Sequence, residues 1–424
     1  MALILISGRF EDEDEDEEEF GASFHFVRWN LMGSCKKMCD KQTKLASKCR
    51  VVKRAKLIVA SSEASADMLY ATRFRAPDAF AFVGTKERTA VLLSDLEVDR
   101  GRREAKVDDV VSYSELEKAV QGAKKKKPAY AKVLARFLKS RDVRRVLTPV
   151  DFPLGLARAL KKENIRVQPA DALFWPSREI KNAQEIEALG AALRIAEAGM
   201  ARAHDILKRT AIRKDGRLSW SGKALTAEIL RREMEIAVVR AGGEARGDTI
   251  VACGELACDP HERGSGPLFA NQLIILDIFP RDARSGYFGD LTRTVVRGNA
   301  SEAQKRLWET CLRGQERALQ ALKPGASGRE IHEDVKAFFA ESGYPTQIKE
   351  GRWQGFFHGT GHGLGLEIHE EPRFAATTFR PGQVFTVEPG IYWPGVGGTR
   401  HEDVAEITAD RCRLISDFPK QMEI

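Results

Sequence analysis

Five separated residues in the last third of the chain are of the types that bind divalent cations: Asp277, Asp290, His362, Glu388 and Glu402. Together they supply four carboxylates and one imidazole. Such a donor set suits two cations held side by side with a water-derived nucleophile between them. Because oxygen donors predominate, hard or borderline ions are favoured, so Mn²⁺ is expected first, followed by Co²⁺, Fe²⁺ or Zn²⁺.

Each of the five lies in a segment typical of a strand or a turn. Asp277 ends the apolar run LIILD, which predicts a buried strand, and Asp290 follows after the turn DARSG. Because side chains alternate along a strand, such a hairpin can bring both carboxylates onto one face. Glycines flank His362 in GTGHGLG, where they allow close backbone approach and leave room for a metal. Glu388 in FTVEPGIY and Glu402 in RHEDVAEIT lie on apolar strand patterns, where a bare charge needs a partner.

The segments LIILDIFPRDARSGYFGDLTRT, FHGTGHGLGLEIHEEPR, FTVEPGIY and GGTRHEDVAEIT resemble the pita-bread metallopeptidases. The resemblance is to the branch of Xaa-Pro dipeptidases (prolidases) and Xaa-Pro aminopeptidases, and it covers roughly Val51 to the C-terminus. It implies that Asp277 binds one metal ion, that His362 and Glu388 bind a second, and that two carboxylates bridge the pair. The bridging residues would be Asp290 and Glu402.

The resemblance also implies a mechanism and further site residues. We expect a metal-bridged hydroxide to attack the scissile carbonyl, while Glu388 takes its proton and later delivers it to the leaving nitrogen. Three histidines match positions that hold the substrate or donate to the tetrahedral oxyanion, namely His261, His358 and His369.

Two arginines match further motif positions. Arg373, in HEEPR, matches an arginine that holds the substrate carboxylate in some prolidases, and a planar guanidinium suits that task. Arg400 lies beside the expected bridging residue Glu402 and is expected to support it.

The chain departs from the family pattern at three places. Thirteen residues separate Asp277 from Asp290, where eleven is usual, but an even insertion can preserve the face on which each lies. His401 stands where an aliphatic residue is usual, and Thr399 replaces another. Because residue 401 faces away from Glu402 on a strand, His401 should not displace a ligand.

Composition bounds the class of protein. The chain has 424 residues, 43% of them hydrophobic and 30% charged, as in soluble globular proteins. It lacks a long apolar run and a signal-peptide pattern, so neither a membrane span nor secretion is expected. Seven irregularly spaced cysteines favour reduced thiols and a cytoplasmic location. The net charge of +7 is dispersed, and a solvated loop explains the run Lys124–Lys127 better than an anion-binding patch does, so we expect no nucleic-acid partner.

Three regions are expected along the chain. Residues 1–50 contain nine consecutive acids and predict a disordered extension, with an acidic interaction tail as the alternative. Residues 51–175 alternate strand and helix patterns, which indicates an α/β layer with a mainly parallel sheet, similar to the N-terminal domain of creatinase. Residues 176–424 are identified with the pita-bread catalytic domain, an α+β fold with a curved antiparallel sheet and helices outside it.

The leading interpretation is metal-dependent hydrolysis of Xaa-Pro bonds in proline-containing peptides. Dipeptides are favoured by Arg373, but an Xaa-Pro aminopeptidase acting on longer peptides stays open. A non-catalytic binding module of the same fold is the alternative from another class, although all five metal positions hold competent ligands. The family further implies a homodimer.

Overall fold

The computed structural model describes residues 53–123 and 126–424. Residues 52–424 form one compact unit. The extension predicted for residues 1–50 therefore lies outside the described residues, as do the first two residues of the run Lys124–Lys127. Among the described residues, no helix is long and apolar enough to cross a membrane.

The N-terminal layer, residues 53–169, is built on one mixed sheet with the strand order β4-β3-β2-β1-β5-β6. Three of its five ladders are parallel, and the ladders of β2 with β1 and with β3 are antiparallel. A short turn joins β2 to β3, whereas the connection from β1 to β2 contains helix α2 (Ala66–Thr72). The strands are β1 (Lys53–Ala60), β2 (Phe80–Gly84), β3 (Thr89–Leu93), β4 (Asp109–Ser112), β5 (Val143–Thr148) and β6 (Arg166–Pro169).

Helices predicted from apolar periodicity cover this sheet. The segment AYAKVLARFLKS forms α5, and its buried residues Val133, Leu134 and Phe137 share a core with Leu57 and Val146 of the sheet. The segment LGLARALKKEN forms α6. The helices of this layer are α2 (Ala66–Thr72), α3 (Val98–Glu104), α4 (Tyr113–Gln121), α5 (Tyr130–Lys139) and α6 (Leu154–Lys162).

Residues 176–424 begin with a short 3₁₀ turn, η1 (Pro176–Glu179), before the long helix α7 (Ala183–Lys208). The apolar stripe of REIKNAQEIEALGAALRIAEAGMARAHDIL predicts one long helix from Arg178 onwards. The helix instead begins after Asn182, which caps it with Glu185 in a capping box. The sequence also predicts helices over LTAEILRREMEIAVVRAG, SEAQKRLWETCLRGQERALQAL and GREIHEDVKAFFAESG. All three are present, as α8 (Ala227–Arg240), α9 (Glu302–Ala321) and α10 (Gly328–Glu341).

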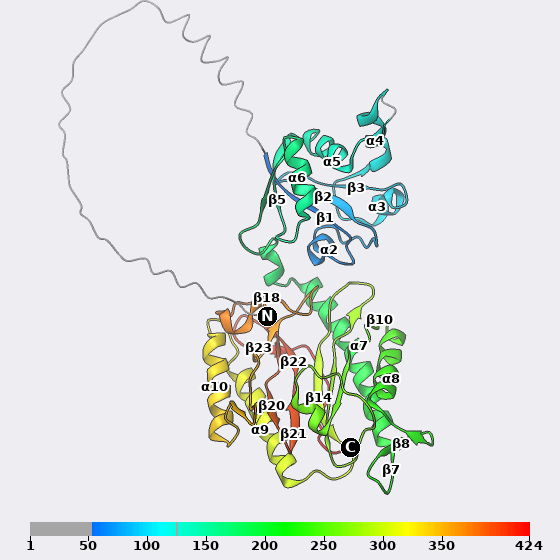
Figure 1. The fold of residues 1–424 in the computed structure, drawn as a ribbon. Helices are drawn as coiled ribbons and strands as arrows, with labels where there is room; N and C mark the ends of the chain where they lie inside the picture. Colours follow the sequence, from blue (N-terminus) through cyan, green and yellow to red (C-terminus); the bar gives the residue numbers. More distant parts are fainter. Residues whose placement is uncertain (1–52, 124–125) are drawn as a thin grey trace, which may run out of the picture. The chain divides into compact units, whose positions relative to one another are not determined.

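Antiparallel strands lie between these helices, with α7 and α8 on one side and α9 and α10 on the other (Figure 1). One sheet has the order β11-β12-β14, and a second has the order β18-β17-β19-β22-β23. Their strands are β11 (Ile250–Cys253), β12 (Leu273–Ile278), β14 (Leu291–Val296), β17 (His362–Gly363), β18 (Glu370–Arg373), β19 (Val384–Val387), β22 (Asp403–Ile407) and β23 (Cys412–Leu414).

Shorter elements complete this part. The pair β20-β21 packs with β21 against β12 and β14 of the first sheet, and the others form small strand pairs or turns. They are β7 (Ala211–Ile212), β8 (Leu218–Trp220), β9 (Lys223–Ala224), β10 (Gly243–Glu244), η2 (Gly254–Cys258), β13 (Arg281–Asp282), β15 (Gln347–Lys349), β16 (Arg352–Gln354), η3 (Phe374–Ala376), β20 (Gly390–Trp393) and β21 (Gly397–Arg400).

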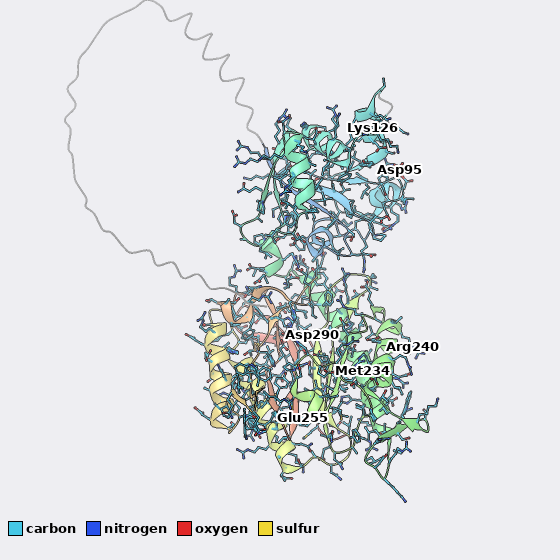
Figure 2. All side chains as sticks on the ribbon, viewed as in Figure 1. Asp95, Lys126, Met234, Arg240, Glu255 and Asp290 are labelled. Carbon is cyan, nitrogen blue, oxygen red and sulfur yellow. The ribbon has the colours of Figure 1, made fainter. Side chains whose placement is uncertain are left out.

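Two apolar cores hold the helices against the strands. One joins α7 and α8 to β11, β12 and β14, and the other joins α9 and α10 to β19 and β22. Asp290, labelled in Figure 2, is buried and lies outside both apolar cores. The cores therefore give a rigid base for polar residues at the strand ends between them.

Candidate metal centre

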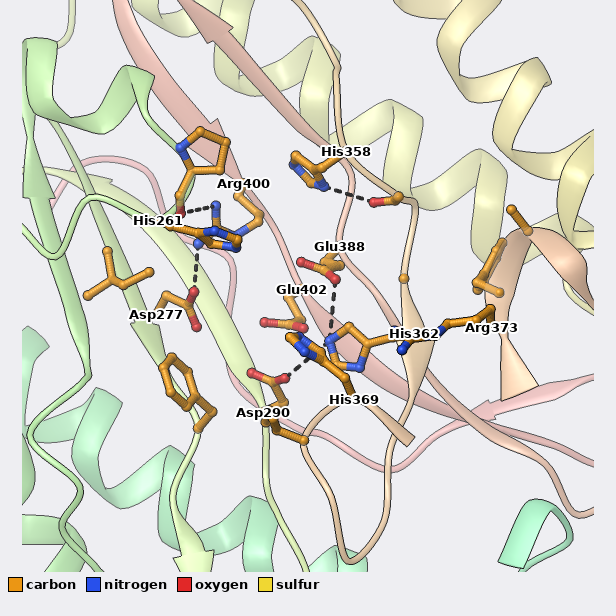
Figure 3. Close-up of a pocket in the computed structure, with 18 residues that line it drawn as sticks. His261, Asp277, Asp290, His358, His362, His369, Arg373, Glu388, Arg400 and Glu402 are labelled. Atoms are coloured by element: carbon orange, nitrogen blue, oxygen red, sulfur yellow. Dashed lines mark hydrogen bonds and ion pairs between the residues drawn. The ribbon is translucent and has the colours of Figure 1, made fainter. Parts of the chain in front are cut away.

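The ten residues named from the sequence line one cavity of about 520 Å³ (Figure 3). Apolar side chains, among them Ile250, Phe279 and Phe374, form other parts of its wall. The predicted residues that it brings together are His261, Asp277, Asp290, His358, His362, His369, Arg373, Glu388, Arg400 and Glu402.

Strand register places Asp277 and Asp290 on the same face of the sheet. Asp277 in β12 lies opposite Thr292 in β14, and Asp290 is two residues before Thr292. The longer hairpin is accommodated away from the cavity, where Asp282 accepts hydrogen bonds from the backbone of residues 284 and 285. The two extra residues therefore leave both carboxylates in place.

His362 lies on the two-residue strand β17, held between neighbouring backbones. Its N–H donates to Thr386 Oγ1 at 3.0 Å, and Nδ1 lies 3.2 Å from the carbonyl oxygen of Gly363. Nε2 then faces the carboxylates, at 3.4 Å from Glu388 Oε1 and 3.6 Å from Asp290 Oδ2. This arrangement leaves Nε2 as the nitrogen that can bind a metal.

Backbone and hydroxyl contacts hold the other two acids. Glu388 follows β19, and its N–H donates to the carbonyl oxygen of Thr360 at 2.8 Å. Glu402 lies between β21 and β22, where its Oε2 accepts from Thr292 Oγ1 at 2.8 Å and its N–H donates to Thr292 O at 3.1 Å. Glu402 is thereby tied to the strand that follows Asp290.

The carboxylates of the cavity disfavour one another's charges. Burial, with the charges of Asp277 and Glu388, raises the pKa of Asp290 well above its ordinary value. Burial and the charge of Asp290 do the same to the pKa of Glu402. Burial also raises the pKa of Glu388 to about 7, although Arg400 opposes the rise. The pocket therefore holds more negative charge than its own cations offset.

The donor geometry fits divalent cations. Ligand atoms of Asp290, His362 and Glu402 all lie within 4.8 Å of one another. Two ligands bonded at about 2.1 Å to one ion lie roughly 3 Å or more apart, so small adjustments would close this group around a metal. Bound cations would also compensate the crowded carboxylates. Asp277 lies outside the tight group, and its Oδ2 accepts from Arg400 Nη2 at 2.6 Å.

The three predicted histidines occupy different settings. His369 is exposed in the cavity, and its ring stacks edge-on against that of His362 with the centroids 4.5 Å apart. His261 is also exposed. His358 is engaged at both ring nitrogens, with Nδ1 2.8 Å from Gly359 O and Nε2 2.9 Å from the hydroxyl of Tyr392.

The two predicted arginines also differ. Arg373 is exposed at the cavity, and its Nε donates to Glu371 Oε1 at 3.2 Å. Arg400 is buried and donates to Asp277 and, at 2.7 Å, to the hydroxyl of Tyr392. Tyr392 thus links Arg400 to His358. The sequence interpretation did not single it out, although an aromatic hydroxyl in the buried segment GIYW was a usable signal.

Comparisons with known proteins identify relatives of this chain. A family model described as metallopeptidase family M24 matches residues 187–409. The Xaa-Pro dipeptidase of Pyrococcus horikoshii is 31% identical over 278 residues, which cover 64% of this chain and 72% of that protein. The Xaa-Pro dipeptidase of Pyrococcus furiosus is 35% identical over 179 residues, 41% of this chain and 49% of that protein.

Two solved structures show the same fold. The prolidase from Pyrococcus horikoshii has a TM-score of 0.69 at 25% identity, covering 91% of this chain and 99% of that one. The X-Pro aminopeptidase from Thermotoga maritima has a TM-score of 0.74 at 23% identity, covering 91% and 100%. An N-terminal α/β layer followed by a pita-bread fold, as the sequence predicted, is therefore confirmed.

Proposed function

The chain belongs to metallopeptidase family M24, and from this premise we propose that it hydrolyses the peptide bond before proline, preferentially in dipeptides. One observation carries the proposal. The five acid and histidine side chains expected to bind metal converge in one cavity, and that cavity also holds His369 and the arginine Arg373. Relatives named Xaa-Pro dipeptidase supply the substrate class.

We propose two divalent cations, with Mn²⁺ preferred, as the cofactor. Asp277 would hold one ion, His362 and Glu388 the other, and Asp290 and Glu402 would contact both. The crowding of carboxylates supports more than one cation, because Arg400 is paired with Asp277 alone. When bound, the ions would acidify a water molecule and polarise the scissile carbonyl.

The chain's own groups would then handle the proton and the substrate. Glu388 takes the proton from the attacking water and returns it to the leaving proline nitrogen, a role suited to a carboxyl whose pKa is raised to about 7. His261 and His369, which are exposed in the cavity, contact the substrate. His358 must give up its contact with Tyr392 or Gly359 before it can donate to the oxyanion.

Arg373 favours dipeptides over longer peptides. Its side chain is 61% exposed at the cavity, so the guanidinium can turn from Glu371 towards the carboxylate of a C-terminal proline. A longer peptide has no carboxylate at that place. The runner-up is an Xaa-Pro aminopeptidase, which the likeness to the Thermotoga maritima fold keeps open.

The remaining proposals concern organisation. We keep residues 51–175 as the N-terminal domain and 176–424 as the catalytic domain. A homodimer is proposed, and a sedimentation mass of a single chain would contradict it.

We also propose a cytoplasmic location, which cell fractionation tests. The described cysteines, Cys253, Cys258, Cys311 and Cys412, are all free, as reduced thiols require.

Initial rates on Ala-Pro, Ala-Pro-Ala and Ala-Ala test the proposed function. The Mn²⁺-loaded protein should cleave Ala-Pro fastest and leave Ala-Ala intact. Comparable cleavage of Ala-Pro-Ala would move the assignment to an aminopeptidase. Cleavage of Ala-Ala as fast as Ala-Pro would refute the requirement for proline.

The Arg373→Ala variant isolates the carboxylate contact. The expected result is a loss of kcat/KM on Ala-Pro of roughly tenfold or more, with little change on Ala-Pro-Ala, because only the dipeptide presents its carboxylate there. Arg373→Lys should retain part of the activity. An equal loss on both peptides would argue against this role.

A further inference from the structure

A buried ion cluster lies behind the cavity and outside its lining. It centres on Glu370, which is only 2% exposed, and on two buried cations, Arg178 and Lys181. Glu370 Oε1 accepts from Lys181 Nζ at 3.1 Å, and its Oε2 accepts from Arg178 Nη2 at 2.9 Å. Both cations come from the segment before α7, far from Glu370 in sequence.

The same carboxylate also binds the backbone of the turn that precedes it. Oε2 accepts from the N–H groups of Leu366 and Glu367 at 2.8 and 3.3 Å. The turn closes tightly on this group, because a Cβ at Gly365 would lie 2.3 Å from Oε2. Glu370 is therefore the buried tie between the turn that joins β17 to β18 and the segment before α7, and Glu367 adds a partly exposed contact with the same Arg178.

This turn carries a cavity residue. His369 precedes Glu370, and successive side chains on an extended segment point to opposite sides. Accordingly, His369 lines the cavity with its ring against His362, while Glu370 does not line it. Gly363, next to His362, pairs in register with Glu370. The position of the His369 ring thus depends on a turn whose backbone donates hydrogen bonds to Glu370, on the side away from the cavity.

We propose that Glu370 is a positioning residue, whose carboxylate, held by Lys181 and Arg178, fixes the turn 364–369 so that His369 faces His362. This inference rests on the proposed function for its kinetic consequence only. Burial alone would raise the pKa of Glu370, but Lys181 and Arg178 bring it below its ordinary value, so the group is charged in the folded chain. Removal of that charge leaves two buried cations without their shared partner.

The Glu370→Gln variant tests the proposal, because glutamine keeps the shape and loses the charge. In the Mn²⁺-loaded full chain, kcat/KM on Ala-Pro per metal-loaded site should fall roughly 10- to 100-fold. A purely structural role would reduce the yield of folded, metal-loaded protein but leave this per-site value unchanged. Glu367→Gln is the matched control, because Glu367 contacts the same Arg178 from a side chain that is 55% exposed. It should stay within about twofold of the parent.

A second readout does not depend on activity. With ¹³C-labelled histidine and diamagnetic Zn²⁺, the ring-to-ring nuclear Overhauser contact of His369 and His362 should be present in the parent chain and lost in Glu370→Gln. A retained contact, or an unchanged per-site kcat/KM, overturns the proposal. If the parent chain does not cleave Ala-Pro, the proposed function fails while the ring contact still decides this inference.

Lys181→Met covers the case in which Glu370→Gln does not fold. It removes one cation and leaves the contacts of Glu370 with Arg178 and the turn backbone in place. A weaker contact between the rings, with an approximately threefold lower per-site kcat/KM, is expected. Unchanged values for both readouts would contradict the proposal.

Discussion

Among the described residues, a single arginine forms an ion pair with one of the four carboxylates of the cavity. Arg400 pairs with Asp277 at 2.6 Å, and none of the described lysines or arginines forms an ion pair with Asp290, Glu388 or Glu402. Buried carboxylates in that state are costly unless a cation joins them or a proton neutralises them. The charge imbalance is therefore the strongest residue-level argument that this cavity binds metal.

Isosteric neutralisation of Asp290 or Glu402 should remove metal and activity together. Asp290→Asn and Glu402→Gln each lose a negative oxygen donor from the group that lies within 4.8 Å. Replacing residues that merely support a ligand costs 10- to 100-fold, so losing a ligand should lower kcat/KM by more than about 100-fold.

Metal content and Ala-Pro turnover check this result. Asp334→Asn is the control, because Asp334 lies half-exposed on α10 and pairs with Arg317. Parent-like turnover in either cavity variant would remove that residue from the metal set.

His204 on α7 should make stability sensitive to acid. The side chain is buried against Phe418, and burial, with Lys208 and Arg293 nearby, lowers its pKa to about 4. The pKa of His204 in the folded chain lies below its unfolded value of about 6.5. Above pH 6.5 the side chain is neutral in both states, and its full contribution to the free energy of unfolding is present at about that pH and higher. As the pH falls towards 4, the unfolded chain binds a proton at His204 that the folded chain does not, so the free energy of unfolding decreases by up to roughly 3 kcal/mol.

His204→Leu should therefore flatten the loss of stability between pH 6.5 and 4. Urea unfolding of the parent and the variant across this pH range measures the difference. Both proteins are metal-free, so that release of metal at low pH cannot change their stability. Identical pH slopes for the parent and the variant would show that folding does not lower the pKa of His204.

At the scale of elements, the two-residue strand β17 holds His362, a candidate metal ligand, between the backbones of β18 and β19. The sequence predicted that glycines beside His362 serve this approach, and a Cβ at Gly361 would lie 1.9 Å from the carbonyl oxygen of Thr386. Periodicity likewise predicted α8, α9 and α10. The start of α7 was misplaced, because the apolar stripe does not mark the cap at Asn182.

Gly361→Ala should displace β17 from β19. The backbone must shift to relieve the contact with Thr386, at a cost of roughly 1–3 kcal/mol, and His362 moves with it. The midpoint temperature of thermal unfolding and the affinity for metal should both decrease.

Gly155→Ala in α6 is the matched control, because its Cβ would meet nothing within 4 Å. That change should leave stability unchanged or raise it by about 0.5–1 kcal/mol. Equal effects at the two glycines would contradict the steric account.

At the scale of the molecule, local motifs and distant contacts differed in how well they could be predicted. The ten cavity residues were identified because each sits in a short, distinctive segment. The cluster of Glu370 with Arg178 was not, because the two lie 192 positions apart and neither stands in a recognisable spacing with the other. The same reason hid Asp67 of α2, which pairs with Arg178 at 2.7 Å.

Removal of residues 1–50 should leave the metal site intact. Every cavity residue and every contact described for it lies within 53–424, which forms its own compact unit. Metal content and Ala-Pro turnover of the shortened chain should stay within about twofold of the full chain, because the shortened chain keeps every cavity contact found among the described residues. A large loss of either would assign residues 1–50 a part in the site.

The central proposal is that these five side chains bind two cations on which Xaa-Pro hydrolysis depends. The most direct test strips the protein of metal and measures Ala-Pro turnover as Mn²⁺ is added in known equivalents per chain. The account predicts no turnover without metal and a rise that saturates at two equivalents. Turnover by the metal-free chain, or two bound ions without cleavage of Ala-Pro, would contradict it.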